Sequence, residues 1–432
     1  MTQRVTGLSA RVAFDVPENW IAEQSDVPEV ESFTYLPGPQ GSFAPNAVLT
    51  LNEYEGGISE FLVKAMDSIR GELEDVVFVD VARWTPASRE DSGVAGEGRS
   101  ISYTHRSPRT GMRLRVDEWL LVGDGLAAQL TTTAGIGQWG IFGPVFAEIA
   151  HTLRFLEGDR LPESNPIPET ARDELASELA GTELERIHGL TELQPFPYEE
   201  GQWIRGASVK LLADMAEGLE VGSLMEEGLA TELAELGELG LMEGTSLTDD
   251  GVAFVAFFES PNATFRLTRS RGDHQGILQA WIFTGAVLIS THGDPEAGAP
   301  SDEYANIMLA PVSDLSTLIA KWVGLQPAWS FPVSPDSFPA ELLAERESAP
   351  EGADAALQAV WDQEWTTWDI LASGPETGVG PFGYLNAGRM GHYLITPSQE
   401  HLTYRAASGR HVLDTLEEVI QATLYGRLAR VG

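Results

Sequence analysis

The second half of the sequence contains two related segments, and this internal repeat constrains the fold more than any other feature. The first copy begins at ATFRLTRS (from Ala263) and ends in the helix pattern LSTLIAKWVGL; the second begins at TTWDILAS (from Thr366) and ends in VLDTLEEVIQATL. Each copy has the pattern of four strands, with glycine turns between them, followed by an amphipathic helix. Two copies roughly one hundred residues apart do not make a solenoid, which needs shorter and more numerous units. The repeat therefore predicts a quasi-twofold domain whose halves share one sheet.

The first part of the chain has a different pattern, in which strands surround two helices. Val12, Phe14 and Val16 alternate with other residues, and several more strand-like runs follow up to residue 134. Apolar residues at helical spacing predict one helix over residues 58–73 and a second over residues 143–155. Because short turns join the strands, we predict an antiparallel sheet with two helices packed on it, an α+β unit.

These patterns divide the chain into three parts. We predict an α+β domain over residues 1–157, an acidic linker with its own helix over residues 158–202, and a second domain over residues 203–432. The two halves of the second domain span residues 203–325 and 339–428, and a helix-rich stretch opens each half.

Two glycine motifs have the spacing of a dinucleotide fingerprint. They are Gly135–Gly140 and Gly378–Gly383. Such a fingerprint works only within a parallel βαβ unit, where the helix N-terminus faces the pyrophosphate. The strands before Gly135 have the pattern of an antiparallel meander, and Pro381 with the alternating residues after it indicates a hairpin. We therefore expect neither motif to bind a nucleotide.

The chain is strongly acidic, with 65 acidic and 27 basic residues and a formal net charge of −38. A field of this sign repels phosphate backbones and anionic lipid, so we expect neither nucleic acid binding nor membrane insertion. The acidity is best explained by solubility; a dedicated basic partner is the alternative. The chain has no cysteine, which excludes disulfides, thiolate metal sites and a thiol nucleophile. Since no signal-peptide pattern opens the sequence, we expect a cytoplasmic location.

The sequence shows no local catalytic signature. The eight histidines are dispersed, and His392, His401 and His411 lack the spacing that would place two on one metal ion. Nucleophile-elbow, phosphate-loop and HExxH motifs are absent from the sequence. We therefore expect a protein that is not an enzyme and has no catalytic residues, cofactor or metal site. A hydrolase assembled from distant residues is the remaining alternative, and it requires a deep pocket that contains acids with shifted pKa values.

Aromatic residues gather where the two copies join. Trp329, Phe331 and Phe338 lie among four prolines, and Trp361, Trp365 and Trp368 belong to the stretch WDQEWTTW. We interpret these rings as a seal between the halves, and an exposed anchor patch for a partner is the alternative.

Residues 10–157 resemble the PsbP-like α+β fold, most closely the actinobacterial LpqN group. The resemblance lies in the stretches FDVPENW, PNAVLTL, ISEFLVKAMDSI, AAQLTTTA and FAEIAHTLRF. LpqN proteins are usually lipid-anchored in the cell envelope. Because this chain has no cysteine to modify, the resemblance does not imply that location here.

Residues 203–428 resemble EspG, the cytosolic chaperone of mycobacterial type VII (ESX) secretion. The resemblance lies in LAELGELGLME, SLTDDGVAFV, TFRLTRS, LAPVSDLSTLIAKWVGL and LQAVWDQEWTTWDILA, and in the last forty or so residues. It implies a quasi-twofold mixed sheet with helical bundles and a role in binding the tip of the PPE partner in PE/PPE heterodimers. EspG proteins have no PsbP-like front domain, so the expected cargo is either a PE/PPE-like or a WXG-type helical protein.

These resemblances imply a non-catalytic chaperone or adaptor of an actinobacterial type VII secretion system. We predict its docking face on the sheet surface and loops of the second domain, including Phe382, Tyr384 and Tyr393, with Trp329 and Phe331 as further partner-binding residues. In the alternative interpretation these aromatic side chains pack beneath the helices. An alternative function makes the first domain a small-ligand or cell-envelope accessory binder, with the second domain as its scaffold. The sequence does not predict the oligomeric state.

Overall fold

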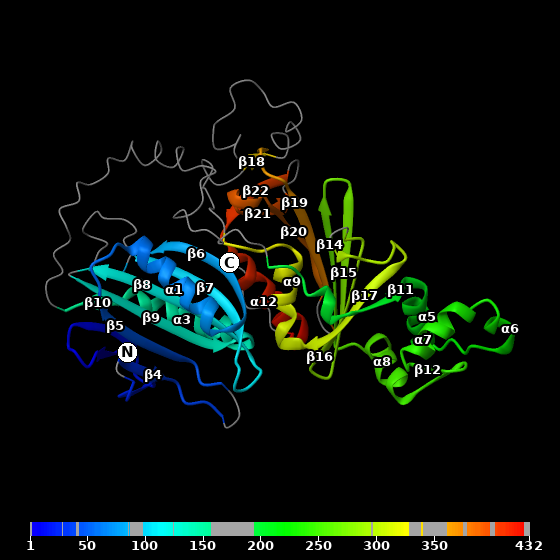
Figure 1. The fold of residues 1–432 in the computed structure, drawn as a ribbon, viewed down its shortest axis with the longest axis horizontal. Coiled ribbons are helices and arrows are strands. Elements are labelled where there is room, and N and C mark those ends of the chain that lie inside the picture. Colours follow the sequence, from blue (N-terminus) through cyan, green and yellow to red (C-terminus); the bar gives the residue numbers. More distant parts are fainter. Residues whose placement is uncertain are drawn as a thin grey trace, which may run out of the picture.

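The computed structural model describes residues 2–27, 29–39, 43–84, 86, 98–123, 125–156, 194–294, 297–327, 338–339, 361–374, 378–397 and 402–426. Most of the expected acidic linker, residues 158–193, lies outside this set, and so does its expected helix. The two domains lie side by side, and helices of the second domain fill the space between the two main sheets (Figure 1).

The first domain is built on a seven-stranded antiparallel sheet. In spatial order its strands are β3 (Ile21–Glu23), β4 (Val30–Tyr35), β5 (Asn46–Glu53), β9 (Leu126–Gly135), β8 (Arg113–Gly123), β7 (Gly98–Arg106) and β6 (Glu74–Trp84). A separate three-stranded sheet contains β1 (Thr2–Thr6), β2 (Val12–Pro17) and β10 (Arg154–Phe155). Val12, Phe14 and Val16, which the alternation places on one face of β2, are fully buried.

Two helices cover opposite faces of the seven-stranded sheet. Helix α1 (Ile58–Glu72) buries Leu62 and Met66 against Ile101 and Val116. Helix α3 (Trp139–His151), which follows the short 3-10 helix η1 (Ile136–Gln138), packs Phe146 on the other side together with β2. The two faces are distinct because successive side chains of a strand point in opposite directions.

The second domain is built on one ten-stranded sheet. In spatial order its strands are β11 (Gln202–Arg205), β17 (Tyr304–Pro311), β16 (Ala286–His292), β15 (His274–Phe283), β14 (Ala263–Arg271), β19 (Thr366–Ser373), β20 (Gly378–Asn386), β21 (His392–Pro397), β22 (Leu402–Ala407) and β18 (Phe338–Pro339). The order is symmetric about the central pair β14–β19: on each side come the four strands of one copy in sequence order, followed by one short strand. The expected quasi-twofold sheet is therefore present.

The α+β class predicted from the sequence is confirmed, but the second sheet is antiparallel and not mixed. Every pairing among its described strands is antiparallel. The reason is local, because consecutive strands within each copy are linked by short connections. Thr284 and Gly285, for example, both have positive φ angles in the two-residue turn between β15 and β16.

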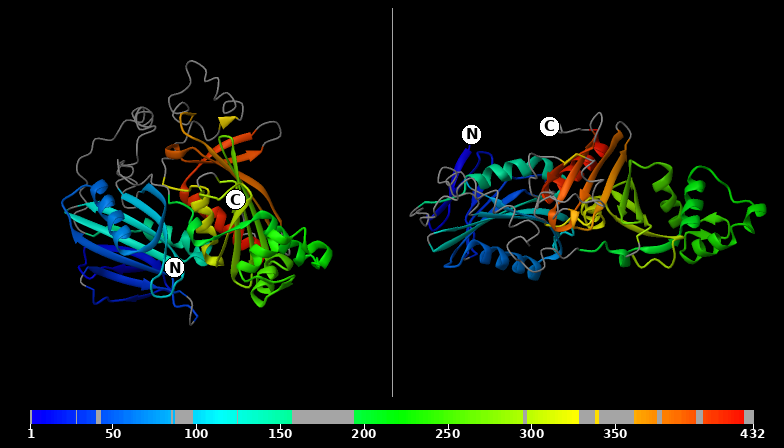
Figure 2. Two further views of the ribbon diagram at one scale, coloured as in Figure 1. Left: turned by 45° about the vertical axis from the view of Figure 1, so that its right-hand side comes forward. Right: turned by 90° about the horizontal axis from the view of Figure 1, so that it is seen from above.

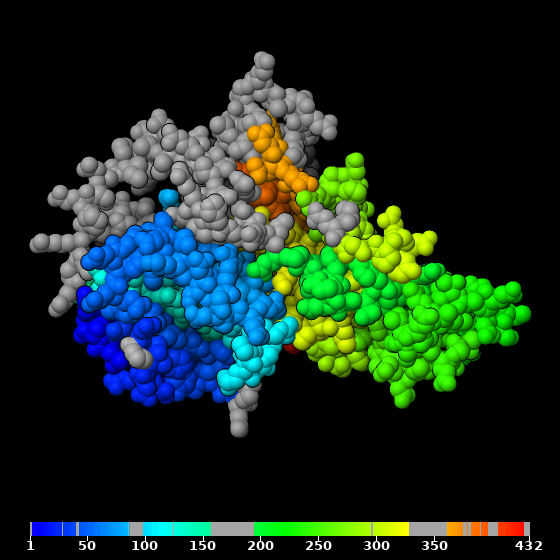
Figure 3. All heavy atoms as spheres, viewed as in Figure 1, coloured from blue at the N-terminus to red at the C-terminus, as the bar shows by residue number. Residues whose placement is uncertain are grey.

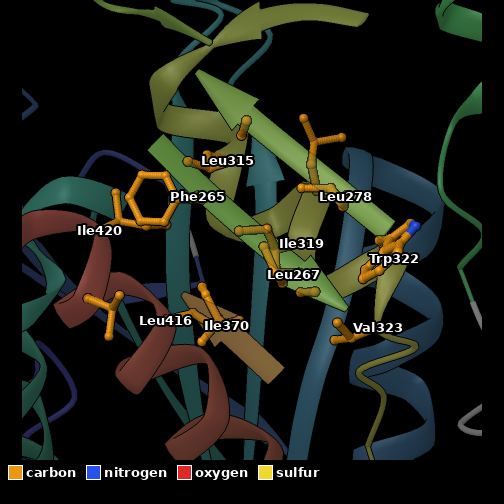
Figure 4. Close-up of a cluster of buried hydrophobic side chains, with 14 of the residues drawn as sticks. Phe265, Leu267, Leu278, Leu315, Ile319, Trp322, Val323, Ile370, Leu416 and Ile420 are labelled. Atoms are coloured by element: carbon orange, nitrogen blue, oxygen red, sulfur yellow. The ribbon is translucent and has the colours of Figure 1, made fainter. Parts of the chain in front are cut away.

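One helix from each copy covers the same face of this sheet. Helix α9 (Leu315–Trp322), preceded by η5 (Val312–Asp314), contributes Leu315 and Ile319, and helix α12 (Gly409–Tyr425) contributes Leu416 and Ile420. These side chains meet Leu267 and its neighbours from the central strands, as Figure 4 shows. The shared core therefore joins the two copies into one domain.

A helical lobe packs on the opposite face near the β11 end of the sheet. It contains α5 (Gly206–Ala216), α6 (Ser223–Glu226), α7 (Ala230–Glu238), the small hairpin of β12 (Met242–Glu243) and β13 (Ser246–Leu247), and α8 (Asp249–Glu259). Phe257 of α8 packs on Leu288 and Ile307 of the sheet, while Leu212 and Leu236 form a core within the lobe. The lobe projects from the end of the molecule farthest from the first domain in all views (Figures 1 and 2).

Truncation of Leu267 tests the importance of the central strand pair. Leu267 is fully buried opposite Ile370 of β19, so Leu267→Ala is expected to lower the free energy of unfolding by about 3 kcal/mol. Leu371→Ala is the matched control, because Leu371 is 46% exposed on the adjoining strand. Urea unfolding followed by circular dichroism measures both, and equal losses in the two variants would contradict this account of the core.

Candidate functional site

The two domains meet largely through polar side chains, with Val79 of β6 packed in the apolar core of the second domain. Strands β6, β7 and β8 turn a face that includes Asp80, Arg113, Arg115 and Asp117 towards α9 and α12. Each of these four side chains is at least 94% buried. Buried charges are stable only when they are paired, so the partners on the helices decide how the domains fit together.

Arg115 is the central group of this junction. Its side chain is fully buried, with Nη2 lying 2.7 Å from Asp414 Oδ1 and Nη1 lying 3.2 Å from Glu417 Oε2, both on α12. Its guanidinium also lies 4.5 Å from the ring centroid of Trp139 on α3. Arg410 makes the reverse connection, from α12 to Asp117 on β8, at 2.9 Å.

A second ionic cluster links the first domain to α9. Asp314 lies 2.5 Å from Arg106 Nη2 and 3.3 Å from Arg113 Nε. Asp75, which also pairs with Arg113, accepts a hydrogen bond of 2.8 Å from Lys321 Nζ. The first domain therefore holds a helix from each half of the second domain.

The start of α12 comes very close to strand β6. The backbone N–H of Arg410 donates to Asp80 Oδ2 at 3.3 Å. A Cβ atom placed on Gly409 would lie only 2.1 Å from the carbonyl oxygen of Val79. Glycine at position 409 is therefore needed for the close approach of the two backbones.

A groove of about 740 Å³ opens beside this junction, between α3 and α12. We call it the α3–α12 groove. Its α3 side includes the apolar residues Ile136, Trp139, Ile141, Pro144 and Ala147, and its α12 side includes Arg410, Asp414, Glu417, Glu418, Gln421 and Tyr425. Ile141 is 70% exposed and Tyr425 is 67% exposed, so the groove is open to solvent. Its volume lies within the range of small-molecule sites, about 300–1,000 Å³.

Burial controls the acids of the groove. It raises the pKa of Glu417 to about 8 against the opposing effect of Arg115, and it raises the pKa of the half-buried Glu418. Burial likewise raises the pKa of Asp80, in the junction behind the groove, to about 6. A pocket with acids of shifted pKa is what the hydrolase alternative requires, so the structure does not remove that alternative.

Gly137 and Gly140 of the first glycine motif line this groove. Strand β9 ends at Gly135, and Gly137, Gly140 and Gly143 follow on η1 and α3. Strands β8 and β9 are antiparallel, so the parallel βαβ setting of a dinucleotide fingerprint is not formed at this point. The glycines instead leave the α3 wall without side chains at these positions.

The aromatic side chains proposed for docking have different positions. Tyr384 and Tyr393 are buried, and Tyr384 stacks on Trp368 at a centroid distance of 4.8 Å. These two tyrosines therefore belong to the core, as the alternative interpretation expects, and do not form a docking surface. Phe382 is partly buried against the same core, while Trp329 and Phe331 lie outside the described residues. The burial of Trp361 and Trp368 agrees with a seal between the halves.

A smaller cavity of about 410 Å³ lies at the C-terminal end of α9, beside Trp322. Arg269 pairs with Asp294 at 2.6 Å and lies 4.7 Å from the ring centroid of Trp322. Tyr198 also hydrogen-bonds to Asp294. Because these groups bind one another, we assign them a structural role.

The part of the chain that the structure describes contains neither a candidate metal site nor a candidate membrane-spanning helix. Its His, Asp and Glu side chains form no group of three or more that could hold a metal ion. Among its helices, none has the length and apolar character needed to cross a membrane.

The matches between this chain and solved structures have low sequence identity and low TM-scores. The sequence matches no family model, and it matches no curated protein. Among solved structures, cyanobacterial PsbP from Synechocystis matches with 11% identity and a TM-score of 0.27, covering 36% of this chain and 92% of that chain. LpqN of Mycobacterium tuberculosis, described as involved in cell envelope biogenesis, matches with 12% identity and a TM-score of 0.27, covering 36% and 90%. The Saccharomyces cerevisiae Ran-binding protein Mog1p matches with 9% identity and a TM-score of 0.26, covering 36% and 95%.

The PsbP and LpqN structures match an N-terminal part of the chain. The expected resemblance of residues 203–428 to EspG is not supported by these comparisons and stays a prediction.

Gly409→Ala tests the close approach of α12 to β6. Because the added Cβ would collide with the Val79 carbonyl, we expect the free energy of unfolding to fall by about 1–3 kcal/mol. Gly71→Ala, in α1, is the matched control, since a Cβ there meets no atom within 4 Å and alanine favours the helix. Urea unfolding measures both variants, and equal stability of the two would contradict the inferred contact.

Asp80→Asn tests the burial of acids at the junction. The pKa of Asp80 is raised in the folded state, so its contribution to stability is fully present below about pH 4 and is lost as the pH rises through about 6. Between pH 5 and 7 we expect the free energy of unfolding of the wild type to fall by on the order of 1 kcal/mol more than that of Asp80→Asn. Asp26→Asn, at an exposed position, should leave the decrease unchanged. Unfolding curves at several pH values provide the measurement, and parallel pH profiles for wild type and Asp80→Asn would refute the assignment.

Proposed function

We propose that this chain is a non-catalytic cytoplasmic chaperone or adaptor that binds helical substrates of an actinobacterial type VII secretion system, of PE/PPE-like or WXG type. The observation that carries the proposal is the helical lobe, which projects from the rest of the molecule (Figure 3). The lobe exposes large apolar side chains. Leu224 of α6 is 99% exposed, Met225 is 40% exposed and Val252 of α8 is 57% exposed. Apolar side chains presented by short helices suit an apolar helical partner.

The position of the lobe supports this proposal. Helix α6 lies at the far end of the lobe, away from the junction of the domains (Figures 1 and 2). Glu226 and Glu227 directly follow the exposed Leu224 and Met225 in the sequence and are themselves exposed. Acidic residues around an apolar contact keep the free protein soluble and discriminate between partners by charge.

The chemistry of the α3–α12 groove favours binding over hydrolysis. Asp414 and Glu417 are both held by Arg115, and the groove lining contains no serine, lysine or histidine. The described lining therefore offers these acids no serine, lysine or histidine as a partner nucleophile or base.

The groove also supports a second candidate function, in which the first domain binds a small ligand. Its apolar α3 wall and its volume of about 740 Å³ are suited to a small molecule. In that case the second domain serves as one wall of the binding site.

Substitutions in the lobe distinguish the two functions. We expect the tagged wild-type chain, purified from its native host, to carry a helical protein pair in stoichiometric amount. The double variant Leu224→Glu, Met225→Glu should retain less than about a tenth of that pair, because two buried apolar contacts would become charged. Mass spectrometry and circular dichroism of the eluate identify and quantify the partner.

Leu8→Glu is the control, because Leu8 is 54% exposed but lies in the first domain. It should retain the partner fully. Undiminished binding by the double variant would refute the lobe as the docking surface, and a retained small molecule without any protein partner would support the second candidate.

A further inference from the structure

The two walls of the α3–α12 groove differ in chemistry. On the α3 side, Trp139, Ile141 and Pro144 present an apolar surface. Gly140 adds open space, since a Cβ atom there would meet no other atom within 4 Å. This wall is suited to the hydrocarbon part of a ligand, whose transfer from water is favourable.

The α12 wall carries an excess of negative charge. Asp414, Glu417 and Glu418 have the i, i+3 and i+4 spacing that places side chains on one helix face. A single guanidinium, that of Arg115, pairs with both Asp414 and Glu417. The other cation of this wall, Arg410, is paired with an acid of β8. Carboxylates therefore outnumber the cations available to them.

Glu417 is an unusual member of this wall. It is only 7% exposed, yet neither carboxylate oxygen accepts a hydrogen bond from any residue that the structure describes. Among the residues that the structure describes, its ion-pair partner is Arg115, whose Nη1 lies 3.2 Å from Glu417 Oε2. Buried carboxylates normally accept several hydrogen bonds, and an ammonium group supplies three donors.

We propose that the α3–α12 groove binds a small organic cation with an apolar body, of the chemical class of an alkylammonium ion. The hydrocarbon chain lies on Trp139, Ile141 and Pro144, and the cationic head donates hydrogen bonds to Glu417 and its acidic neighbours. The site does not depend on the proposed adaptor function, because it lies at the domain junction and not on the helical lobe.

The test compares three ligands of equal chain length on the full chain. Isothermal titration calorimetry with n-octylammonium, octan-1-ol and octanoate is carried out at about pH 9, above the pKa of Glu417 and below that of an alkylammonium ion. We expect octylammonium to bind at least about tenfold more tightly than octanol, and octanoate to bind more weakly than octanol, because the acidic wall attracts the first head group and repels the last. Equal affinity for octylammonium and octanol would overturn the proposal.

Variants on the two walls separate the charge from the apolar surface. Glu417→Gln should weaken octylammonium binding by about tenfold. Glu148→Gln is the matched control, since Glu148 is exposed on α3 outside the groove, and it should bind like wild type. Wild-type affinity in Glu417→Gln would overturn the proposal.

Ile141→Lys provides a variant that does not disturb the core, because Ile141 is 70% exposed. The new ammonium group would occupy the groove and repel the ligand. We expect loss of octylammonium binding with an unchanged unfolding midpoint, and retained binding would overturn the proposal.

Discussion

The burial of Arg115 is the constraint on which the arrangement of the two domains depends. A fully buried guanidinium must be neutralised, and its partners Asp414 and Glu417 come from a helix almost three hundred residues away in the sequence. This pairing fixes α12 against the first domain, and the contact with Trp139 fixes α3 beside it. The groove between α3 and α12 therefore exists only because the two domains hold each other in this position.

Local patterns were sufficient to predict much of the fold. Alternation placed Val12, Phe14 and Val16 on a buried face, and helical spacing located α1 and the second half of α3. The repeat predicted a shared quasi-twofold sheet, because two copies of one strand–helix unit can bury a common core only by pairing. The mixed sheet was wrong because it came from a resemblance and not from the short connections within each copy.

The candidate site could not be predicted, because its residues come from distant segments. Nothing near Arg115 in the sequence indicates that Glu417 is its partner, and neither residue belongs to a motif. The glycines from Gly135 onward were the one visible signal, and they proved to mark the groove for a reason other than nucleotide binding. The burial of Tyr384 and Tyr393 could not be predicted either. Alternation identifies the two faces of a strand, but it does not tell which face the helices cover.

The central β14–β19 pair would make α9 and α12 equivalent if the two copies were alone. The single first domain contacts Asp314 at the end of η5 and Lys321 on α9. On α12 it contacts Arg410, Asp414 and Glu417. Because the first domain has no twofold symmetry of its own, it makes different contacts with α9 and with α12. A substitution that α9 tolerates on the surface facing the first domain therefore need not be tolerated at the equivalent position of α12.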